Sequence, residues 1–237
     1  MKSIFKEVCD TYTKRYLVED NAELPLMTRY SVLVQVKACA LSEVDDKVLQ
    51  VLYRDSKIVK YPVGQDISGI VREVGNAVTT LKPGDEVVGI VPLDYGLSGC
   101  TEYVVLHEFD VSKYLDSLVL FGEYARRSKG RQTYSILYPY GQRPYSNPIV
   151  HTKFLDPPNS RTLYLKCASV GFLFEQAWSL SSTQQGRYLH ILMDIMEKVA
   201  DGIIVPNIHH TVPFDSVTDA MKCLSEIRVG KVVMKME

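Results

Sequence analysis

Apolar and polar residues alternate along several short segments in the first half of the chain. Between residues 31 and 38, one face of an extended chain carries only apolar side chains, namely Val32, Val34, Val36 and Ala38. This alternation predicts a half-buried strand. Further strands are predicted at 69–75, 86–91 and 102–106, with a Lys-Pro-Gly-Asp turn at 82–85. Residues 28–106 therefore have the pattern of a barrel or sandwich rather than of a βαβ array.

The pattern changes in the second half of the chain. Residues 161–174 predict a strand that needs a neighbour, with Leu163, Leu165 and Cys167 on one face. A helix is predicted next, because Ser181 or Ser182 can act as its N-cap with Gln184 or Gln185 three residues later. Gly202 ends this helix. Its apolar side consists of Tyr188, Leu192, Ile195, Met196 and Val199.

Two more elements complete the expected order. An amphipathic helix is predicted after Asp215, with Val217, Ala220, Met221 and Leu224 at helical spacing. A final strand is predicted at 231–235, where three apolar residues lie between two lysines.

Residues 113–153 differ in composition from the rest of the chain. They contain six of the 15 tyrosines, and seven Lys and Arg residues face only Asp116 and Glu123. Pro139, Pro144 and Pro148 interrupt any long helix or central strand, so the segment is predicted to be an irregular connector. Interleaved Tyr and Arg could also stack on single-stranded nucleic acid, but no RNP or KH motif accompanies them. The connector is the preferred interpretation.

Overall composition narrows the class of protein. The 237 residues carry 27 Lys and Arg against 28 Asp and Glu, and 46% are hydrophobic, which is typical of a globular protein. A nearly neutral chain does not favour nucleic-acid binding. The longest stretch without charged residues, 202–214, contains Pro206 and is too short to span a bilayer, so no membrane association is expected. The N-terminus has no apolar signal-peptide run, which predicts a cytoplasmic protein.

Cysteine and histidine usage predicts no metal centre. The five cysteines, at positions 9, 39, 100, 167 and 223, form no Cys-x-x-Cys pair and are expected to be reduced thiols packed as small hydrophobic residues. The histidines form no metal-binding pattern. His209 and His210 adjoin, but neighbours on a strand point to opposite sides, and all five histidines are expected to face solvent.

Several motifs occur in order along the chain and resemble one known family. The first group lies at 36–45, 62–71, 74–75, 81–89 and 99–103, and the second at 193–202, 206, 212–214, 220 and 230–233. Together they resemble the catalytic domain of the medium-chain dehydrogenases/reductases. Segments 155–158, 178–180 and 184–188 are most similar to its quinone oxidoreductase-like, zeta-crystallin-like group.

The resemblance implies an α+β fold with a GroES-like β-barrel catalytic domain and a truncated remnant of an α/β nucleotide-binding domain. Residues 1–112 and 184–237 would form the catalytic domain, 113–153 the connector, and 154–183 the remnant. The family's dinucleotide site needs a glycine-rich turn at a helix N-terminus. The sequence has only Gly96-Leu-Ser-Gly99 and Gly230-Lys231, and each precedes a strand. No cofactor-binding residue is therefore expected, although the family uses NADPH.

The same resemblance locates candidate site residues. Zinc-using members of the family bind the metal through a Cys and a His, and Ser42 and Gln65 occupy those positions here. Hydroxyl and amide groups are poor zinc ligands, so the resemblance is to zinc-independent quinone reductases. Ser42, Asp45 and Gln65 are the candidate cleft residues. Alternatively, Asp45 caps a helix that begins near residue 46, and Asp66 bonds turn amides.

Three functional hypotheses remain. The preferred one is a quinone oxidoreductase-like protein that is non-catalytic because the NADPH fingerprint is absent. The first alternative is an active NADPH-dependent quinone or enone reductase that uses an unrecognised site or a partner chain. The second is a protein-interaction module, in which the predicted strand within 162–174 pairs with a second copy or a protein partner. A hydrolase is not favoured, because the chain has no Gly-x-Ser-x-Gly motif.

Overall fold

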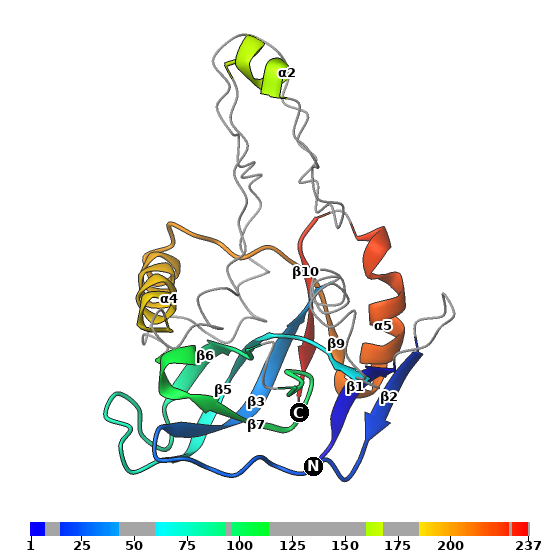
Figure 1. The fold of residues 1–237 in the computed structure, drawn as a ribbon. Coiled ribbons are helices and arrows are strands. Elements are labelled where there is room, and N and C mark those ends of the chain that lie inside the picture. Colours follow the sequence, from blue (N-terminus) through cyan, green and yellow to red (C-terminus); the bar gives the residue numbers. More distant parts are fainter. Residues whose placement is uncertain are drawn as a thin grey trace.

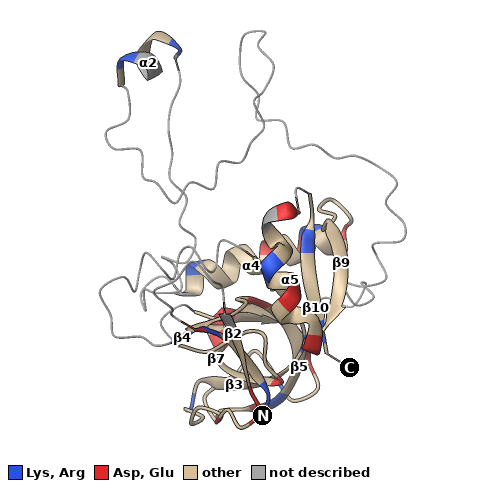
Figure 2. Ribbon diagram, turned by 90° about the vertical axis from the view of Figure 1, so that its right-hand side faces the viewer, with Lys and Arg blue, Asp and Glu red and all other residues tan. Residues whose placement is uncertain are grey.

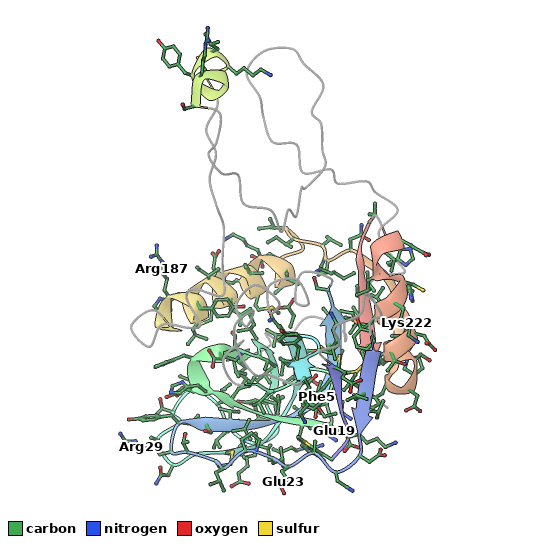
Figure 3. All side chains as sticks on the ribbon, turned by 45° about the vertical axis from the view of Figure 1, so that its right-hand side comes forward. Phe5, Glu19, Glu23, Arg29, Arg187 and Lys222 are labelled. Carbon is green, nitrogen blue, oxygen red and sulfur yellow. The ribbon has the colours of Figure 1, made fainter. Side chains whose placement is uncertain are left out.

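The computed structural model contains two β-sheets and describes residues 1–7, 15–42, 60–92, 96–113, 160–167, 185–227 and 229–236 (Figure 1). The small sheet has strand β1 (Ser3–Glu7) between β2 (Arg15–Glu19) and β4 (Lys60–Pro62), and both pairings are antiparallel. Ile4 and Phe5 of β1 are buried. Phe5 and Glu19 are labelled in Figure 3, and Lys60 binds the Glu19 carboxylate above the Phe5 ring.

The large sheet combines strands from both ends of the chain. Its strands are β3 (Ser31–Leu41), β5 (Asp66–Val74), β6 (Glu86–Ile90), β7 (Tyr103–His107), β8 (Val111–Lys113), β9 (Ile208–Pro213) and β10 (Lys231–Lys235). The order is β8-β6-β5-β3-β10-β9, and β7 also pairs with β3. Strand β10 runs antiparallel to β3 and parallel to β9. The last strand therefore closes against the third, as Figure 1 shows.

Strand β3 changes its neighbour halfway along its length. Residues 31–35 pair with β7, whereas residues 38–41 pair with β10. The register with β5 shifts between Val36 and Ala38, which is the sign of a β-bulge. The bulge reverses the alternation, so Cys39 and Leu41 enter the core and Ala38 does not. The expectation that Ala38 shares the buried face of Val32 was therefore wrong.

The strand predicted at 231–235 is present with the predicted bounds, and those predicted at 69–75, 86–91 and 102–106 are present with small differences at their ends. The predicted turn at 82–85 is also present, and the Gly84 amide donates to the Val71 carbonyl at 2.8 Å. The helix predicted after Asp215 is the 3₁₀ turn η4 (Phe214–Ser216), α5 (Val217–Cys223) and the 3₁₀ turn η5 (Leu224–Glu226). Its residues Val217, Met221 and Leu224 belong to the core, as expected.

Helix α4 (Gln185–Ala200) packs against the 3₁₀ turn η2 (Glu108–Asp110) and against β8, the strand at one end of the large sheet. Met196 and Val199 are buried there, and Gly202 follows with a φ of 71°. Ile195 is 39% exposed, so the prediction that it belongs to the buried side was wrong. The proposed N-cap serines, Ser181 and Ser182, lie outside the described residues. Figure 3 labels Arg187 at the start of this helix.

The segment predicted as a strand within 161–174 is helical where the structure describes it. Helix α2 (Ser160–Leu165) replaces the strand, and Cys167 has a φ of 47°. In Figure 1, α2 lies apart from both sheets. A strand needs a neighbour for its backbone hydrogen bonds, whereas a helical turn forms them within itself, so a segment away from the sheets adopts the helix. Residues 168–174 lie outside the described part.

The remaining predictions about organisation concern segments that are only partly described. Residues 114–159, most of the proposed connector, lie outside the described residues, and the domain boundaries at 112, 153 and 184 stay predictions. Figure 2 shows acidic and basic segments interspersed over the sheets and helices. Among the described helices, no long apolar helix capable of crossing a bilayer occurs.

Candidate functional site

The ends of three neighbouring strands, β3, β5 and β10, lie side by side in the large sheet and bring together residues from distant parts of the chain. This place, marked by Ser42, Gln65 and Lys231, is called the Ser42 edge below. Ser42 directly follows β3, Gln65 directly precedes β5, and Lys231 opens β10. The antiparallel pairing of Val232 with Leu41 places Lys231 beside Ser42. The pairing of Cys39 with Ile67 brings the start of β5 to the other side of the same strand end. Two of the three candidate residues, Ser42 and Gln65, thus flank one point, and Asp45 lies outside the described residues.

Ser42 is bonded to a lysine that the sequence analysis did not select. The Lys231 ammonium donates to the Ser42 hydroxyl oxygen, with an Nζ–Oγ distance of 3.0 Å. Ser42 is 7% exposed, whereas Lys231 is exposed. Within the described part of the chain, Lys231 forms no ion pair shorter than 4.0 Å. The two residues are 189 positions apart, so no local pattern could join them, although the Gly-Lys motif at 230–231 marked the strand that carries the lysine.

Asp66 adds a carboxyl group at the same edge. Loss of hydration raises its pKa above the ordinary value of 3.8, and the charge of Lys231 lowers it by less. The residue nevertheless has an exposed surface, so its carboxyl lies where protein atoms crowd it but water still reaches it. Because water reaches the carboxyl, the raised pKa corresponds to only a small free energy. The alternative role for Asp66, bonding turn amides, has no counterpart among the described hydrogen bonds.

Gln65 has a buried side-chain amide without an acceptor. The residue is 5% exposed, and no described atom accepts a hydrogen bond from Nε2. Its backbone carbonyl is satisfied, because it accepts from the Val91 amide at 2.8 Å. A buried donor left unpaired costs about 1–3 kcal/mol, and such groups usually bind a water or ligand oxygen. The Gln65 amide is therefore a buried donor that is available to a ligand oxygen.

Gly64 fixes the backbone that leads into Gln65. Its φ is 77°, and a Cβ atom there would lie 2.3 Å from Cys39 Sγ and 3.0 Å from Cys100 Sγ. Only glycine fits both the conformation and the space. The Gly64 carbonyl also accepts from the Gly99 amide at 2.9 Å. The loop is thus anchored to the core.

A zinc ion does not fit this site. The described residues contain no group of three or more His, Cys, Asp or Glu side chains that could hold a metal. Ser42 and Gln65 supply a hydroxyl and an amide, which are poor ligands for zinc. The Lys231 ammonium, 3.0 Å from the Ser42 oxygen, would also repel a divalent cation.

The family's nucleotide site also has no counterpart in the described ranges. The site needs a glycine turn that lets a phosphate approach a helix N-terminus. In helix α4, Gly186 has nothing within 4 Å of an added Cβ, so no close approach requires it. Helix α5 has Asp219 in its first turn and follows Asp215, and these carboxylates would repel a phosphate.

Two groups of residues outside the site differ from expectation. His209 and His210 are both exposed, as predicted, but their Nδ1 atoms lie 2.6 Å apart instead of on opposite sides. The register shift between β9 and β10 at this position explains their convergence. The four described cysteines form no disulfide, and of these four Cys39 and Cys100 are buried.

His107 is only half-buried and does not simply face solvent. Its ring lies 5.7 Å from that of Tyr30 and 5.0 Å from that of Phe109, and its Nδ1 accepts from the Phe109 amide. The Arg29 guanidinium, labelled in Figure 3, covers Tyr30 at 4.7 Å.

Comparison with known proteins agrees with this architecture. Residues 28–127 match the alcohol dehydrogenase GroES-like domain. The chain is 25% identical to quinone oxidoreductase-like protein 1 of Mus musculus, over 95% of this chain and 97% of the relative. Their alignment has 339 positions and the chain has 237 residues, so at least 102 positions contain no residue of this chain.

Two further proteins are similar over different extents. The NADPH-dependent alkenal/one oxidoreductase of Arabidopsis thaliana chloroplasts is 37% identical over 94 residues, which cover 39% of this chain and only 24% of the relative. The crystal structure of an alcohol dehydrogenase superfamily protein from Novosphingobium aromaticivorans aligns with a TM-score of 0.71, over 99% of this chain and 100% of that chain. Its sequence identity is 14%, so this likeness concerns the fold.

Proposed function

We propose that this chain binds ligands at the Ser42 edge without reducing them by itself. The premise is that it belongs to the medium-chain dehydrogenase/reductase superfamily through its GroES-like domain. It would be a quinone oxidoreductase-like protein that lacks NADPH-dependent catalysis of its own. No cofactor is expected to bind this chain by the family's usual route.

One observation carries the proposal. The alignment with quinone oxidoreductase-like protein 1 contains at least 102 positions without a residue of this chain. Strand β10 still pairs with β3, so the GroES-like sheet remains assembled from both ends of the chain. The shortening is therefore compatible with an intact sheet, and the sequence between its two parts has no glycine-rich fingerprint.

Nucleotide binding and turnover test this proposal directly. Ligand at a hundred times its dissociation constant adds about 2.7 kcal/mol to the folded state, so bound NADPH would raise the melting temperature. We expect no rise, and no protein-dependent loss of NADPH absorbance with duroquinone as acceptor. Equimolar inorganic phosphate is the control for a nonspecific anion effect. A rise of several degrees with NADPH alone, or measurable turnover, contradicts the proposal.

A second candidate is an active reductase that completes its nucleotide site with an unrecognised segment or a partner chain. The polar edge formed by Ser42 and Lys231 favours it, as does the identity with the alkenal/one oxidoreductase in the matched segment. If two copies complete each other's site, turnover per molecule rises with protein concentration. Constant and negligible turnover over the micromolar range argues against this alternative.

Association through the segment predicted as a strand is a separate proposal. In helix α2, Tyr164 is 83% and Leu165 is 70% exposed, so two large apolar side chains face water. Sedimentation of the unmodified chain should show a dimer or larger species, and Leu165→Lys should weaken it. Met193→Lys, at a position 52% exposed in α4, is the matched control. A monomer at all micromolar concentrations overturns the proposal.

A further inference from the structure

We infer that Lys231 is the group that recognises the ligand at this edge, by donating hydrogen bonds from its ammonium to a carbonyl oxygen of a quinone or enone. Ser42 is the positioning residue that holds the ammonium in place. The inference rests on the proposed function, because it requires the GroES-like domain to bind a ligand.

The first step concerns the direction of the lysine side chain. Lys231 pairs with Ile208 of β9, and the next residue, Val232, pairs with Leu41 of β3, so the sheet fixes the backbone of Lys231 beside Ser42. The Lys231 amide donates to the Asn207 carbonyl at 2.9 Å, which anchors the start of the strand from the other side. The Nζ–Oγ bond of 3.0 Å then directs the ammonium over the end of β3. The sheet pairing and the bond to Ser42 together therefore fix the position of the Lys231 ammonium.

The second step concerns unused hydrogen-bond capacity. An ammonium has three N–H donors, and the described contacts of Lys231 use one of them, to Ser42. Gln65, on the other side of the same strand end, has a buried Nε2 with no acceptor. The edge thus has an excess of donors, which a ligand with acceptor oxygens would satisfy.

The third step concerns the charge of the ligand. Asp66 is close enough for the Lys231 charge to lower its pKa, yet no ion pair shorter than 4.0 Å joins them in the described chain. A phosphate would be repelled by the Asp66 carboxylate, whereas a neutral carbonyl oxygen with partial negative charge would not. The balance favours a neutral carbonyl over a multiply charged anion.

The test measures binding of a carbonyl probe to the full chain and needs no cofactor. Duroquinone is suitable, because its methylated ring does not add to the exposed thiols of Cys167 and Cys223. Lys231→Met keeps the length of the side chain and removes the charge, and Lys231→Arg keeps the charge. Lys235→Met is the matched control, since Lys235 is another exposed lysine of β10 and lies about 13 Å further along the strand.

We expect Lys231→Met to weaken duroquinone binding about 10- to 100-fold, as for loss of a hydrogen bond to a charged group. Lys231→Arg should restore most of the affinity, and Lys235→Met should have none of this effect. Ser42→Ala should weaken binding about threefold, because the ammonium remains but loses its anchor. The infrared carbonyl stretch of bound duroquinone should shift to lower frequency, and Lys231→Met should abolish the shift.

Two results overturn the inference. One is no binding of duroquinone to the unmodified chain, and the other is equal binding by the Lys231→Met and unmodified chains. Benzoate and inorganic phosphate serve as additional probes, and tighter Lys231-dependent binding of either one identifies an anion site and contradicts the carbonyl assignment. NADPH turnover tests the absence of catalysis and is measured separately, so a failure of the Lys231 assignment is distinguishable from a failure of the proposed function.

Discussion

Two Asp–Lys pairs at opposite ends of strand β6 are built differently. Asp85, just before β6, is 7% exposed, and its two oxygens accept from the Lys113 ammonium at 2.8 Å and the Lys82 amide at 3.0 Å. Asp66 pairs with Ile90 at the far end of β6, is exposed, and senses Lys231 only through its charge. Both oxygens of the Asp85 carboxylate are therefore hydrogen-bonded, whereas the Asp66 carboxylate forms no described ion pair with Lys231.

The two carboxyl groups titrate in opposite directions as a result. Burial alone would raise the pKa of Asp85, but bonds from Lys113 and Lys82 and the charges of both lysines lower it below 3.8. At Asp66, loss of hydration is the larger effect and the pKa is raised. Saturated hydrogen bonds indicate a structural role at the 82–85 turn, whereas unsaturated donors indicate a binding role at the other end.

The largest effect should come from the glycines that shape the two ends. Gly64→Ala forces a Cβ to within 2.3 Å of Cys39 Sγ at a φ of 77°, and should reduce the free energy of unfolding by about 3 kcal/mol or more. Gly84→Ala has a similar φ of 92° but an open space, and should cost about 1 kcal/mol. Urea unfolding measures both. Equal losses would mean that packing does not distinguish the two ends.

Amide substitution of the two aspartates should separate structural from binding roles. Asp85→Asn removes the charge that holds Lys113 and should cost about 2 kcal/mol. Asp66→Asn removes a carboxylate that the fold does not stabilise, so stability should stay the same or rise slightly. Urea unfolding at neutral pH provides the comparison. A larger loss for Asp66→Asn than for Asp85→Asn would reverse our interpretation.

The pH dependence of stability should carry both signs. Because the pKa of Asp85 is lowered by folding, its contribution is present above pH 3.8 and is lost as the pH falls through its folded pKa. The raised pKa of Asp66 favours the protonated folded state, so its unfavourable contribution appears as the pH rises above 3.8. The deficit of Asp85→Asn relative to the unmodified chain should therefore shrink in acid. A deficit that is constant down to acid unfolding contradicts the assignment.

The smallest expected effects are those of the two lysines. Lys113→Met leaves Asp85 with fewer partners and should cost about 1 kcal/mol. Lys231→Met should leave the melting temperature unchanged, because this exposed side chain contributes one bond, to Ser42. Thermal unfolding of both variants tests the difference. If Lys231→Met is as destabilising as Lys113→Met, Lys231 has a structural role.

Much of the fold follows from local patterns. Alternation located the first part of β3, a short apolar run located the final strand, and the Lys-Pro-Gly-Asp sequence located the turn at 82–85. Helix α5 followed from the spacing of its core residues. These features depend on neighbours within a few residues, so a short stretch of chain contains the information. The family motifs also located Ser42 and Gln65, two residues of the candidate site.

Other features depend on which segments meet, and only the tertiary structure decided them. The bulge in β3 arises where this strand leaves β7 and joins β10, and it decides that Cys39 and Leu41, not Ala38, enter the core. Helix α2 forms where no sheet is available to pair with.

The candidate site also combines what local sequence determines with what tertiary structure determines. Ser42 was evident from its motif, but its bond to Lys231 joins residues 189 positions apart through the pairing of β3 with β10. The sequence determined which side chains the chain carries and which short elements they favour. Strand register determined which of them touch, because a shift of one residue turns each side chain to the opposite face of the sheet.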